Sequence, residues 1–230
     1  MLRPTDPLAG STWSAPGTVD GFVRSPPNAV LMTFAAHELG RHEGARALDV
    51  GCGAGRNAVP LARLGWKVTG TDLSWPMLCA AAARVRDERL GDRVHVALAP
   101  MGALPVRDRS CDLVIAHGIW NLARSAADFR RAVREAARVA RPGAALFVFT
   151  FSRNTLAPDA EPVPGEPFVF TQFSSQPQCF LTEEQLLSEL GDAGFAREPS
   201  VPLAEYNRPR PGQLASGAPV IYEAAFRLQY

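Results

Sequence analysis

Hydrophobic and polar residues alternate along positions 45–151 with two different periods. Short apolar runs that end in turn residues predict buried strands, and apolar residues repeated every three or four positions between them predict helices. The predicted strands cover residues 46–50, 67–71, 94–98, 112–116 and 144–150. Strands that alternate with helices in this way are joined by right-handed crossovers and form a parallel sheet covered on both faces. We therefore predict a doubly wound α/β fold.

Polar capping residues mark where three of the predicted helices begin. Ser74 and Ser125 each precede a run with helical spacing, and Thr182 can form a capping box with Gln185. The inward-facing residues of these helices are Met77, Ala81 and Val85 in the first, Phe129, Val133, Ala136 and Ala140 in the second, and Leu186, Leu187 and Leu190 in the third. The second helix is expected to end at residues 141–143, where the sequence Arg-Pro-Gly cannot continue it.

The two ends of the sequence lack this regularity. Residues 1–27 contain prolines at five positions (4, 7, 16, 26 and 27) and are expected to form an irregular arm ahead of an amphipathic segment at 28–40. Residues 152–180 are rich in Pro, Phe, Gln and Ser. This stretch is too long for an ordinary connection and too aromatic for a linker, so we expect it to pack as a lid. Two further strands are expected after the helix that begins at Thr182.

Three glycines, Gly51, Gly53 and Gly55, stand at every second position directly after the first predicted strand. In a parallel sheet, ligands bind beyond the carboxyl ends of the strands, and the first strand-to-helix turn is where the backbone approaches a ligand most closely. Glycines there allow positive φ and expose amide N–H groups and a helix N-terminus to the polar end of a ligand. The turn is therefore a candidate cofactor site.

Asp72 ends the second predicted strand, about 20 residues beyond the glycine turn, where a carboxylate can accept hydrogen bonds from both hydroxyls of a ribose. The turn and the acid together indicate an adenosine-containing cofactor. A dinucleotide fingerprint needs a third glycine where this sequence has Arg56, so that the pyrophosphate can rest on the helix. This difference weighs against a nicotinamide-dependent oxidoreductase.

The overall charge and composition limit which classes of binding partner the protein can have. A net charge of +1 offers no basic excess for nucleic acid or an anionic membrane surface. Four well-separated cysteines match neither a zinc site nor a dense disulfide framework, so we expect reduced thiols and no metal. The start of the sequence lacks an apolar core of signal-peptide length, and no apolar run approaches the ~18 residues of a membrane span. These features favour a cytoplasmic protein.

At the glycine turn, at Asp72 and in the segments that follow, the sequence resembles the class I S-adenosylmethionine-dependent methyltransferases. The motifs that carry the resemblance are Asp49-Val-Gly-Cys-Gly-Ala-Gly55, Val68-Thr-Gly-Thr-Asp72, Leu104-Pro105 ahead of Asp112-Leu-Val-Ile-Ala116, and Arg138-Val-Ala-Arg-Pro-Gly143. They cover residues 45–151, and the later helix and strands extend the likeness over most of the rest. The resemblance implies a Rossmann-like, mostly parallel seven-stranded sheet whose last strand is antiparallel.

The resemblance also implies which residues bind the cofactor S-adenosylmethionine. The glycine turn would hold its methionine portion, Asp49 its amino group, Asp72 the ribose, and Leu73 would pack on the adenine. The full implied set is Asp49, Gly51, Cys52, Gly53, Gly55, Asn57, Asp72, Leu73, Met101, Gly102 and His117. Pro100 stands where many members of the family have an Asp for the adenine amino group, so the backbone of Met101 and Gly102 is left to contact the adenine edge.

His117 directly follows the fourth predicted strand, where a general base would stand if the acceptor had to lose a proton. It is therefore the candidate catalytic residue, and a packing role or a cofactor contact is the alternative. In the family, the N-terminal arm and the segment after the fifth strand cover the acceptor. The candidate acceptor-site residues in these two segments are Trp13, Phe22, Arg24, Phe168, Phe170, Gln172 and Phe173.

The resulting prediction is one methyltransferase domain over residues 1–230 that acts on a small-molecule acceptor, with neither nucleic acid nor membrane as a partner. Its expected parts are an N-terminal arm and helix (1–44), a cofactor-binding core (45–151), a lid-like insertion (152–181) and a C-terminal helix with strands (182–230). The alternatives are a nicotinamide-dependent oxidoreductase and a non-catalytic module that binds S-adenosylmethionine.

Overall fold

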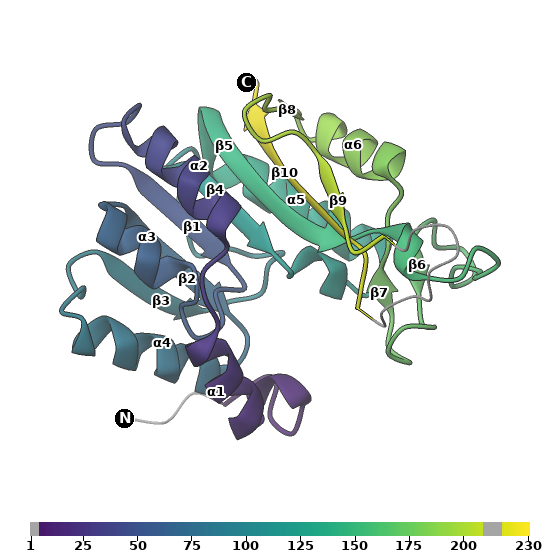
Figure 1. Cartoon of the computed structure of the whole chain (residues 1–230), viewed down its shortest axis with the longest axis horizontal. Coiled ribbons are helices and arrows are strands. Elements are labelled where there is room, and N and C mark those ends of the chain that lie inside the picture. Colours follow the sequence, from purple (N-terminus) through teal and green to yellow (C-terminus); the bar gives the residue numbers. More distant parts are fainter. Residues whose placement is uncertain (1–4, 209–217) are drawn as a thin grey trace.

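A single large sheet forms the centre of the protein in the computed structural model, which describes residues 5–208 and 218–230 (Figure 1). The strand order is β3-β2-β1-β4-β5-β10-β8, with β9 also paired to β10. Its parallel strands are β1 (Arg46–Val50), β2 (Lys67–Asp72), β3 (Val94–Leu98), β4 (Cys111–His117) and β5 (Ala140–Phe151). The order reverses between β1 and β4, which are neighbours, so the turns after these two strands stand at the switch point where sheets of this kind bind ligands.

Strand β10 (Ile221–Leu228) runs antiparallel to β5 and separates it from β8 (Phe195–Arg197). The short strand β9 (Ala204–Tyr206) pairs with the first residues of β10. The antiparallel last strand is thus confirmed. The predicted number of strands was too low: within the described residues, three strands instead of two follow the last helix, and the sheet has eight strands instead of seven. Three-residue strands are too short to produce a recognisable alternation.

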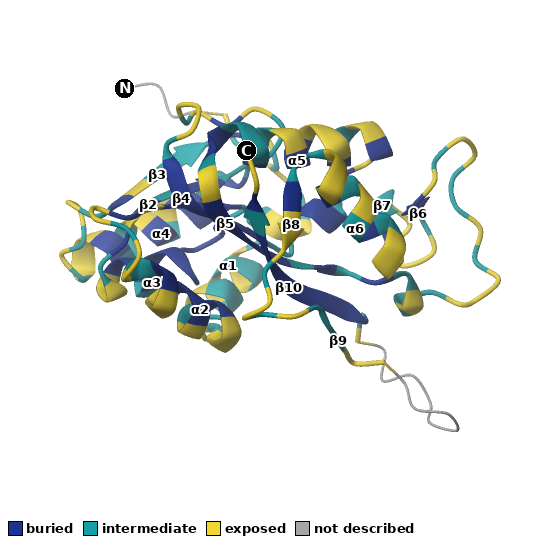
Figure 2. Cartoon of the chain, turned by 90° about the horizontal axis from the view of Figure 1, so that it is seen from above, coloured by how far each residue is buried: buried dark blue, intermediate teal, exposed yellow. Residues whose placement is uncertain are grey.

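Helices cover both faces of the sheet (Figure 2). One face carries α2 (Ala29–Leu39), α3 (Ala58–Leu64) and α4 (Trp75–Asp87), and the other carries α5 (Ala126–Val139) and α6 (Glu183–Asp192). Each face has its own hydrophobic core, in which the largest buried side chains include Trp66 and Phe147 on the first face and Trp120 and Phe129 on the second. The predicted caps at Ser74, Ser125 and Thr182 all accept a backbone hydrogen bond at the start of their helices.

Two predictions of local structure were wrong. The N-terminal arm is not irregular throughout, since it contains the 3-10 turn η1 (Thr12–Ser14) and the helix α1 (Pro16–Arg24). Pro16 sits at the start of α1, where its fixed φ favours a helix and its missing N–H costs nothing. Helix α5 ends at Val139, because Ala140 is already extended and pairs with Cys111 as the first residue of β5.

The stretch after β5 contains little regular structure. It has a 3-10 turn, η3 (Arg153–Thr155), and a two-stranded hairpin of β6 (Val169–Phe170) and β7 (Gln178–Cys179). The hairpin lies beyond the carboxyl end of β5, well apart from α1 in both views (Figures 1 and 2). Within the described residues, none of the helices combines the length and apolar character needed to cross a membrane. All four cysteines are unpaired thiols.

Candidate functional site

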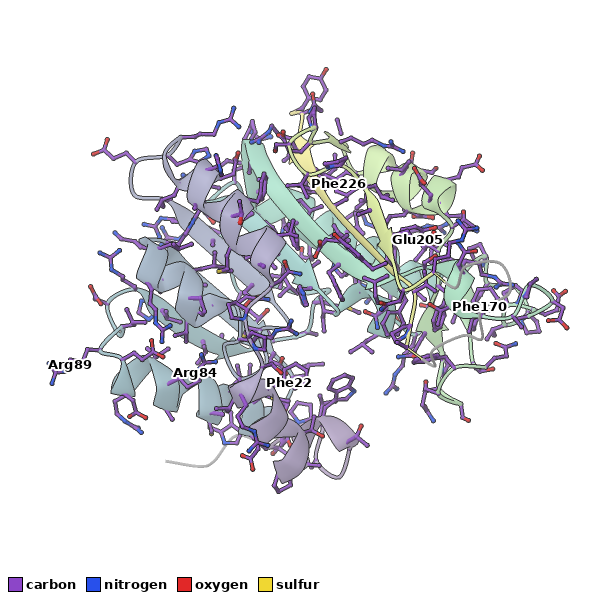
Figure 3. All side chains as sticks on the ribbon, viewed as in Figure 1. Phe22, Arg84, Arg89, Phe170, Glu205 and Phe226 are labelled. Atoms are coloured by element: carbon purple, nitrogen blue, oxygen red, sulfur yellow. The ribbon has the colours of Figure 1, made fainter. Side chains whose placement is uncertain are left out.

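The glycine turn after β1 has the backbone that its sequence predicts. Gly51, Gly53 and Gly55 have φ values of +70°, +53° and +73°, in the left-handed region that favours glycine. A side chain at Gly51 would also lack space, because its Cβ would lie 2.7 Å from the side chain of Ile119. Arg84 of α4 fastens the turn by donating to the carbonyl of Ala54 at 3.0 Å (Figure 3). The turn is therefore a fixed feature of the carboxyl edge of the sheet.

Asp72 lies beside this turn, as predicted. Its Oδ2 atom accepts a hydrogen bond from the backbone N–H of Gly53 at 2.9 Å, and its Oδ1 atom accepts one from Ser74 at 2.8 Å. Burial raises the pKa of Asp72, while the hydrogen bonds from Ser74 and Gly53 lower it. The carboxylate thus stands at the junction of the turns that follow β1 and β2.

Asp49 is buried under the same turn, with only 1% of its surface exposed. Its Oδ2 atom has no hydrogen-bond partner. Burial raises the pKa of Asp49 to about 7, and the nearby charge of Asp72 adds to this effect. A buried acid with one unused oxygen can accept a hydrogen bond from a cationic group, which would stabilise its ionised form.

The other predicted cofactor residues fall into three places. Cys52 and Asn57 are buried in the glycine turn and at the start of α3. Leu73 follows Asp72 and is half-buried. Met101 and Gly102 are half-buried in the loop after β3, where a Cβ on Gly102 would lie 3.2 Å from Arg131 of α5. These residues therefore lie in the turns that follow β1, β2 and β3, while their contacts with a cofactor stay a prediction.

The N-terminal segment crosses this site. The ring of Phe22 in α1 packs against Gly53, so closely that a Cβ on this glycine would lie 3.0 Å from the ring. Trp13 in turn packs edge-on against Phe22. The carbonyl of Trp13 accepts a hydrogen bond from the hydroxyl of Ser74 at 3.3 Å. Arg24 is exposed. Trp13 and Phe22 thus cover the predicted cofactor turn, at a distance from the hairpin that holds Phe170 (Figure 3).

His117 ends β4, and its ring stacks on Phe149 of β5 with centroids 4.2 Å apart. Its Nε2 atom lies 3.3 Å from Nδ2 of Asn28, the N-cap of α2. The orientation of the Asn28 amide is fixed, because its Oδ1 atom accepts the capping hydrogen bond from Leu31 at 2.8 Å. Since Nδ2 can only donate, Nε2 of His117 must accept, and the imidazole is neutral. Burial, with the charge of Arg56 as the next cause, lowers the pKa of His117 to about 4.

Sequence reasoning missed a buried carboxylate on the same face of the sheet. Glu223 of β10 is 3% exposed, and its Oε2 atom accepts a hydrogen bond from Nδ2 of Asn28 at 2.6 Å. Its Oε1 atom accepts one from the hydroxyl of Tyr206 at 3.0 Å. The available signal was a charged residue near the start of an otherwise apolar stretch, Ile-Tyr-Glu-Ala-Ala-Phe.

The aromatic residues predicted for the lid do not form one group. Phe168 is part of the hydrophobic core beneath α5, where it packs edge-on against Phe129. Phe170 and Phe173 instead pack around Phe180, and Phe173 also contacts Phe151 at the end of β5. Gln172 is exposed. Phe173 is 40% exposed, so it is the member of this group that is open to a ligand.

A doubly wound sheet with a glycine turn facing a strand-end acid defines a class of α/β proteins that bind nucleoside-containing cofactors. Comparison with known proteins shows which members of this class the chain is similar to. Residues 48–148 match the family model described as "Methyltransferase domain". Methyltransferase GfsG of Streptomyces halstedii is 36% identical over 148 residues, which are 63% of this chain and 50% of that protein.

The ubiquinone/menaquinone biosynthesis C-methyltransferase UbiE of Hahella chejuensis is 32% identical over 148 residues, or 63% of this chain and 56% of that protein. Among solved structures, the [4+2]-cyclase SpnF has a TM-score of 0.65 at 22% identity, with 86% of this chain and 79% of that chain covered. The chain is therefore similar to methyltransferase domains over residues 48–148, and its fold is one that solved S-adenosylmethionine-dependent methyltransferases share. It spans about half the length of these two curated relatives.

Proposed function

We propose that this chain transfers the methyl group of S-adenosylmethionine to a small-molecule acceptor. The observation that supports this proposal best is the pair of acids around the glycine turn. Asp49 lies buried beneath the turn with an unused oxygen, and Asp72 is held against Gly53 at its rim. A cofactor with an amino group at one end and a ribose at the other matches both acids.

The residues present fit S-adenosylmethionine in three respects. The unpartnered Oδ2 atom of Asp49 can accept a hydrogen bond from the amino group, which would supply the partner that this buried oxygen lacks. Asp72 would hold the ribose hydroxyls while keeping its backbone contacts. The left-handed glycines let the backbone turn sharply between the two acids, so that the methionine portion would lie against backbone atoms of the turn.

The cofactor supplies an electrophilic methyl group on a sulfonium, so the chain has to align the acceptor and keep water away. The N-terminal segment with Trp13 and Phe22 suits the second task, because it covers the turn with apolar rings. His117 as a general base stays a prediction. Two features oppose it, since its Nε2 atom already accepts a hydrogen bond from Asn28 and its pKa of about 4 makes it a weak base at neutral pH.

A small-molecule acceptor is supported by the near-neutral charge of the chain and by the name of one relative, a C-methyltransferase of ubiquinone and menaquinone biosynthesis. The fold by itself does not decide the reaction, because SpnF, a [4+2]-cyclase, shares it. A binding module without methyl transfer and a nicotinamide-dependent oxidoreductase therefore remain the alternatives that an experiment has to separate.

The experiment compares three ligands and then measures turnover. S-adenosylmethionine and S-adenosylhomocysteine should raise the melting temperature while NAD does not, since a ligand at 100 times its dissociation constant stabilises a fold by about 2.7 kcal/mol. Release of S-adenosylhomocysteine is then followed across a panel of small acceptors. A melting shift with NAD alone would exclude the methyltransferase proposal, and binding without any turnover would favour the non-catalytic module.

A further inference from the structure

Glu223 lies in a row of side chains that crosses three strands at the carboxyl ends of β4 and β5. It stands directly opposite Phe149 of β5, which in turn stands opposite His117 of β4. Directly paired residues point to the same face of a sheet, so the three side chains are neighbours on the face that carries α2. This is the edge at which the glycine turn also lies.

Asn28 joins this row to the cofactor turn. Its side chain donates to Glu223 at 2.6 Å, and its backbone N–H donates to Oδ1 of Asn57, at the start of α3, at 3.1 Å. Arg56 adds a second link by donating from Nε to the carbonyl of Pro26 at 2.7 Å. The carboxylate is therefore separated from the cofactor turn by a single residue, Asn28.

The two hydrogen bonds to Glu223 differ in how easily they can be exchanged. Asn28 is fixed, because its amide also caps α2 through Leu31. Tyr206 stands at the end of the three-residue strand β9 and is 42% exposed. Its phenol is therefore the partner that can rotate away toward solvent, and it occupies Oε1 of Glu223 with the kind of O–H group that a hydroxylated ligand would bring.

The surroundings favour an aromatic ligand. Displacement of Tyr206 would free the space of one ring beside Glu223, and on the other side of Glu223 the row continues with Phe149 and His117, whose rings are stacked. An aromatic hydroxyl is also a better match than a cation, because the chain already fills this position with a neutral phenol whose pKa is raised by burial and by its hydrogen bond to Glu223. A phenol with a raised pKa keeps its proton and donates it in a hydrogen bond.

We propose that Glu223 binds the methyl acceptor through a hydroxyl group, that Asn28 is the positioning residue for this carboxylate, and that the acceptor is a hydroxylated aromatic compound that displaces Tyr206. This inference rests on the proposed function, since it assigns the acceptor of the same site. The alternative is that Glu223 only ties β10 to α2 and β9.

The test uses the protein saturated with S-adenosylhomocysteine and two probes, catechol and 1,2-dimethoxybenzene, in which the same two ring oxygens carry hydrogen or methyl. Calorimetry should show catechol binding about tenfold or more tightly than its dimethyl ether, the ratio expected for a hydrogen bond to a charged acceptor. Glu223→Gln should lose most of this preference. Equal affinity for both probes, no binding of catechol, or tighter binding of benzylamine would overturn the proposal.

Tyr206→Phe separates the binding role from a structural role. It leaves Glu223 in place and removes the competing phenol, so catechol affinity should rise several-fold, whereas a purely structural contact predicts no gain. Tyr222→Phe is the matched control, because Tyr222 lies next to Glu223 on β10 but hydrogen-bonds Ser152 on the opposite face. This control should leave catechol affinity unchanged, and an equal gain in both variants would overturn the assignment.

Retained binding of S-adenosylhomocysteine shows that each variant is folded. It also distinguishes a failure of the proposed function from a failure of the Glu223 assignment. If S-adenosylhomocysteine fails to bind the unmodified protein, the proposed function is wrong. If it binds and is released in turnover, but the probes are not distinguished, the cofactor role stands and the assignment of Glu223 is wrong.

Discussion

The Oδ2 atom of Asp72 accepts a hydrogen bond from the backbone N–H of Gly53 at 2.9 Å, so the acid after β2 and the turn after β1 are held together. Asp72→Ala removes this bond and, under the proposed function, the contacts to the ribose. Hydrogen bonds to a charged acceptor contribute roughly 1.5–3 kcal/mol, so the affinity for S-adenosylhomocysteine should fall about ten- to a hundredfold. Calorimetry measures this affinity.

Asp72→Asn is the matched control for this change. Its amide keeps one oxygen acceptor of the same shape, so the loss of affinity should be smaller than in Asp72→Ala. A folded Asp72→Ala variant with unchanged affinity would show that the ribose assignment is wrong.

The buried acid Asp49 should make stability depend on pH. Its pKa is raised from an ordinary 3.8 to about 7, so between these values the folded protein holds a proton that the unfolded chain has released. The free energy of unfolding therefore falls as the pH rises through this window, by roughly a few kcal/mol in total. His117 has the opposite effect on the free energy of unfolding. Its pKa is lowered in the folded protein, so the unfolded chain takes up a proton first as the pH falls below 6.5, and stability falls with it.

The difference between the unmodified protein and Asp49→Asn isolates the contribution of Asp49, since both retain His117. Urea unfolding at pH 5, 6, 7 and 8 should show the variant gaining stability relative to the unmodified protein as the pH rises. A constant difference across this range would mean that the pKa of Asp49 is not raised.

The same acid should control cofactor affinity. If Asp49 binds the amino group of the cofactor as an anion, then binding below pH 7 has to release its proton, and the affinity for S-adenosylhomocysteine should increase between pH 5 and pH 7. The expected slope approaches tenfold per pH unit well below the pKa. Calorimetry in buffers of different ionisation enthalpy would also count the released proton. Asp49→Asn should bind weakly with no such slope.

Gly70 of β2 should support the cofactor turn from the neighbouring strand. A Cβ on Gly70 would lie 2.8 Å from Sγ of the buried Cys52, and the φ of Gly70 is not in the left-handed region, so only space is at issue. Gly70→Ala should therefore cost about 1–3 kcal/mol of stability and weaken cofactor binding. Adding Cys52→Ala removes the sulfur and should restore part of both losses. No rescue in the double variant would contradict the steric explanation.

The segment 152–180 is predicted to cover the acceptor. Phe173→Ala is the sharpest variant, because this ring is 40% exposed and its removal should cost little stability. Acceptor turnover should fall far more than the affinity for S-adenosylhomocysteine. Limited proteolysis of the segment should also slow when cofactor and acceptor analogue are bound. Equal cleavage with and without ligands, together with full turnover, would mean that the segment is only surface packing.

Much of the core could be predicted from the sequence, because its signals are local. The apolar run at 112–116, for example, lies within the buried strand β4, and the cap at Ser74 begins α4 as expected. Helix α1 was missed because prolines and glycines obscure its periodicity, although Pro16 occupies the one helical position that suits it.

The candidate site was only partly predictable for a different reason. The glycine turn and Asp72 follow a short-range motif, and they do meet in space. The contact between Asn28 and Glu223 joins residues 195 positions apart, so no spacing in the sequence indicates it. It exists only because β10 pairs with β5 and brings Glu223 into line with Phe149.

The position of β10 also has a consequence for how the protein is made. This strand follows all the other strands in the sequence, yet it pairs with β5, β8 and β9 in the interior of the sheet. While the ribosome has yet to add residues 221–228, β5 has an open edge and β8 and β9 have no partner among the described strands. A nascent chain can therefore form the half of the sheet that carries the glycine turn before the half that contains Glu223 is able to form.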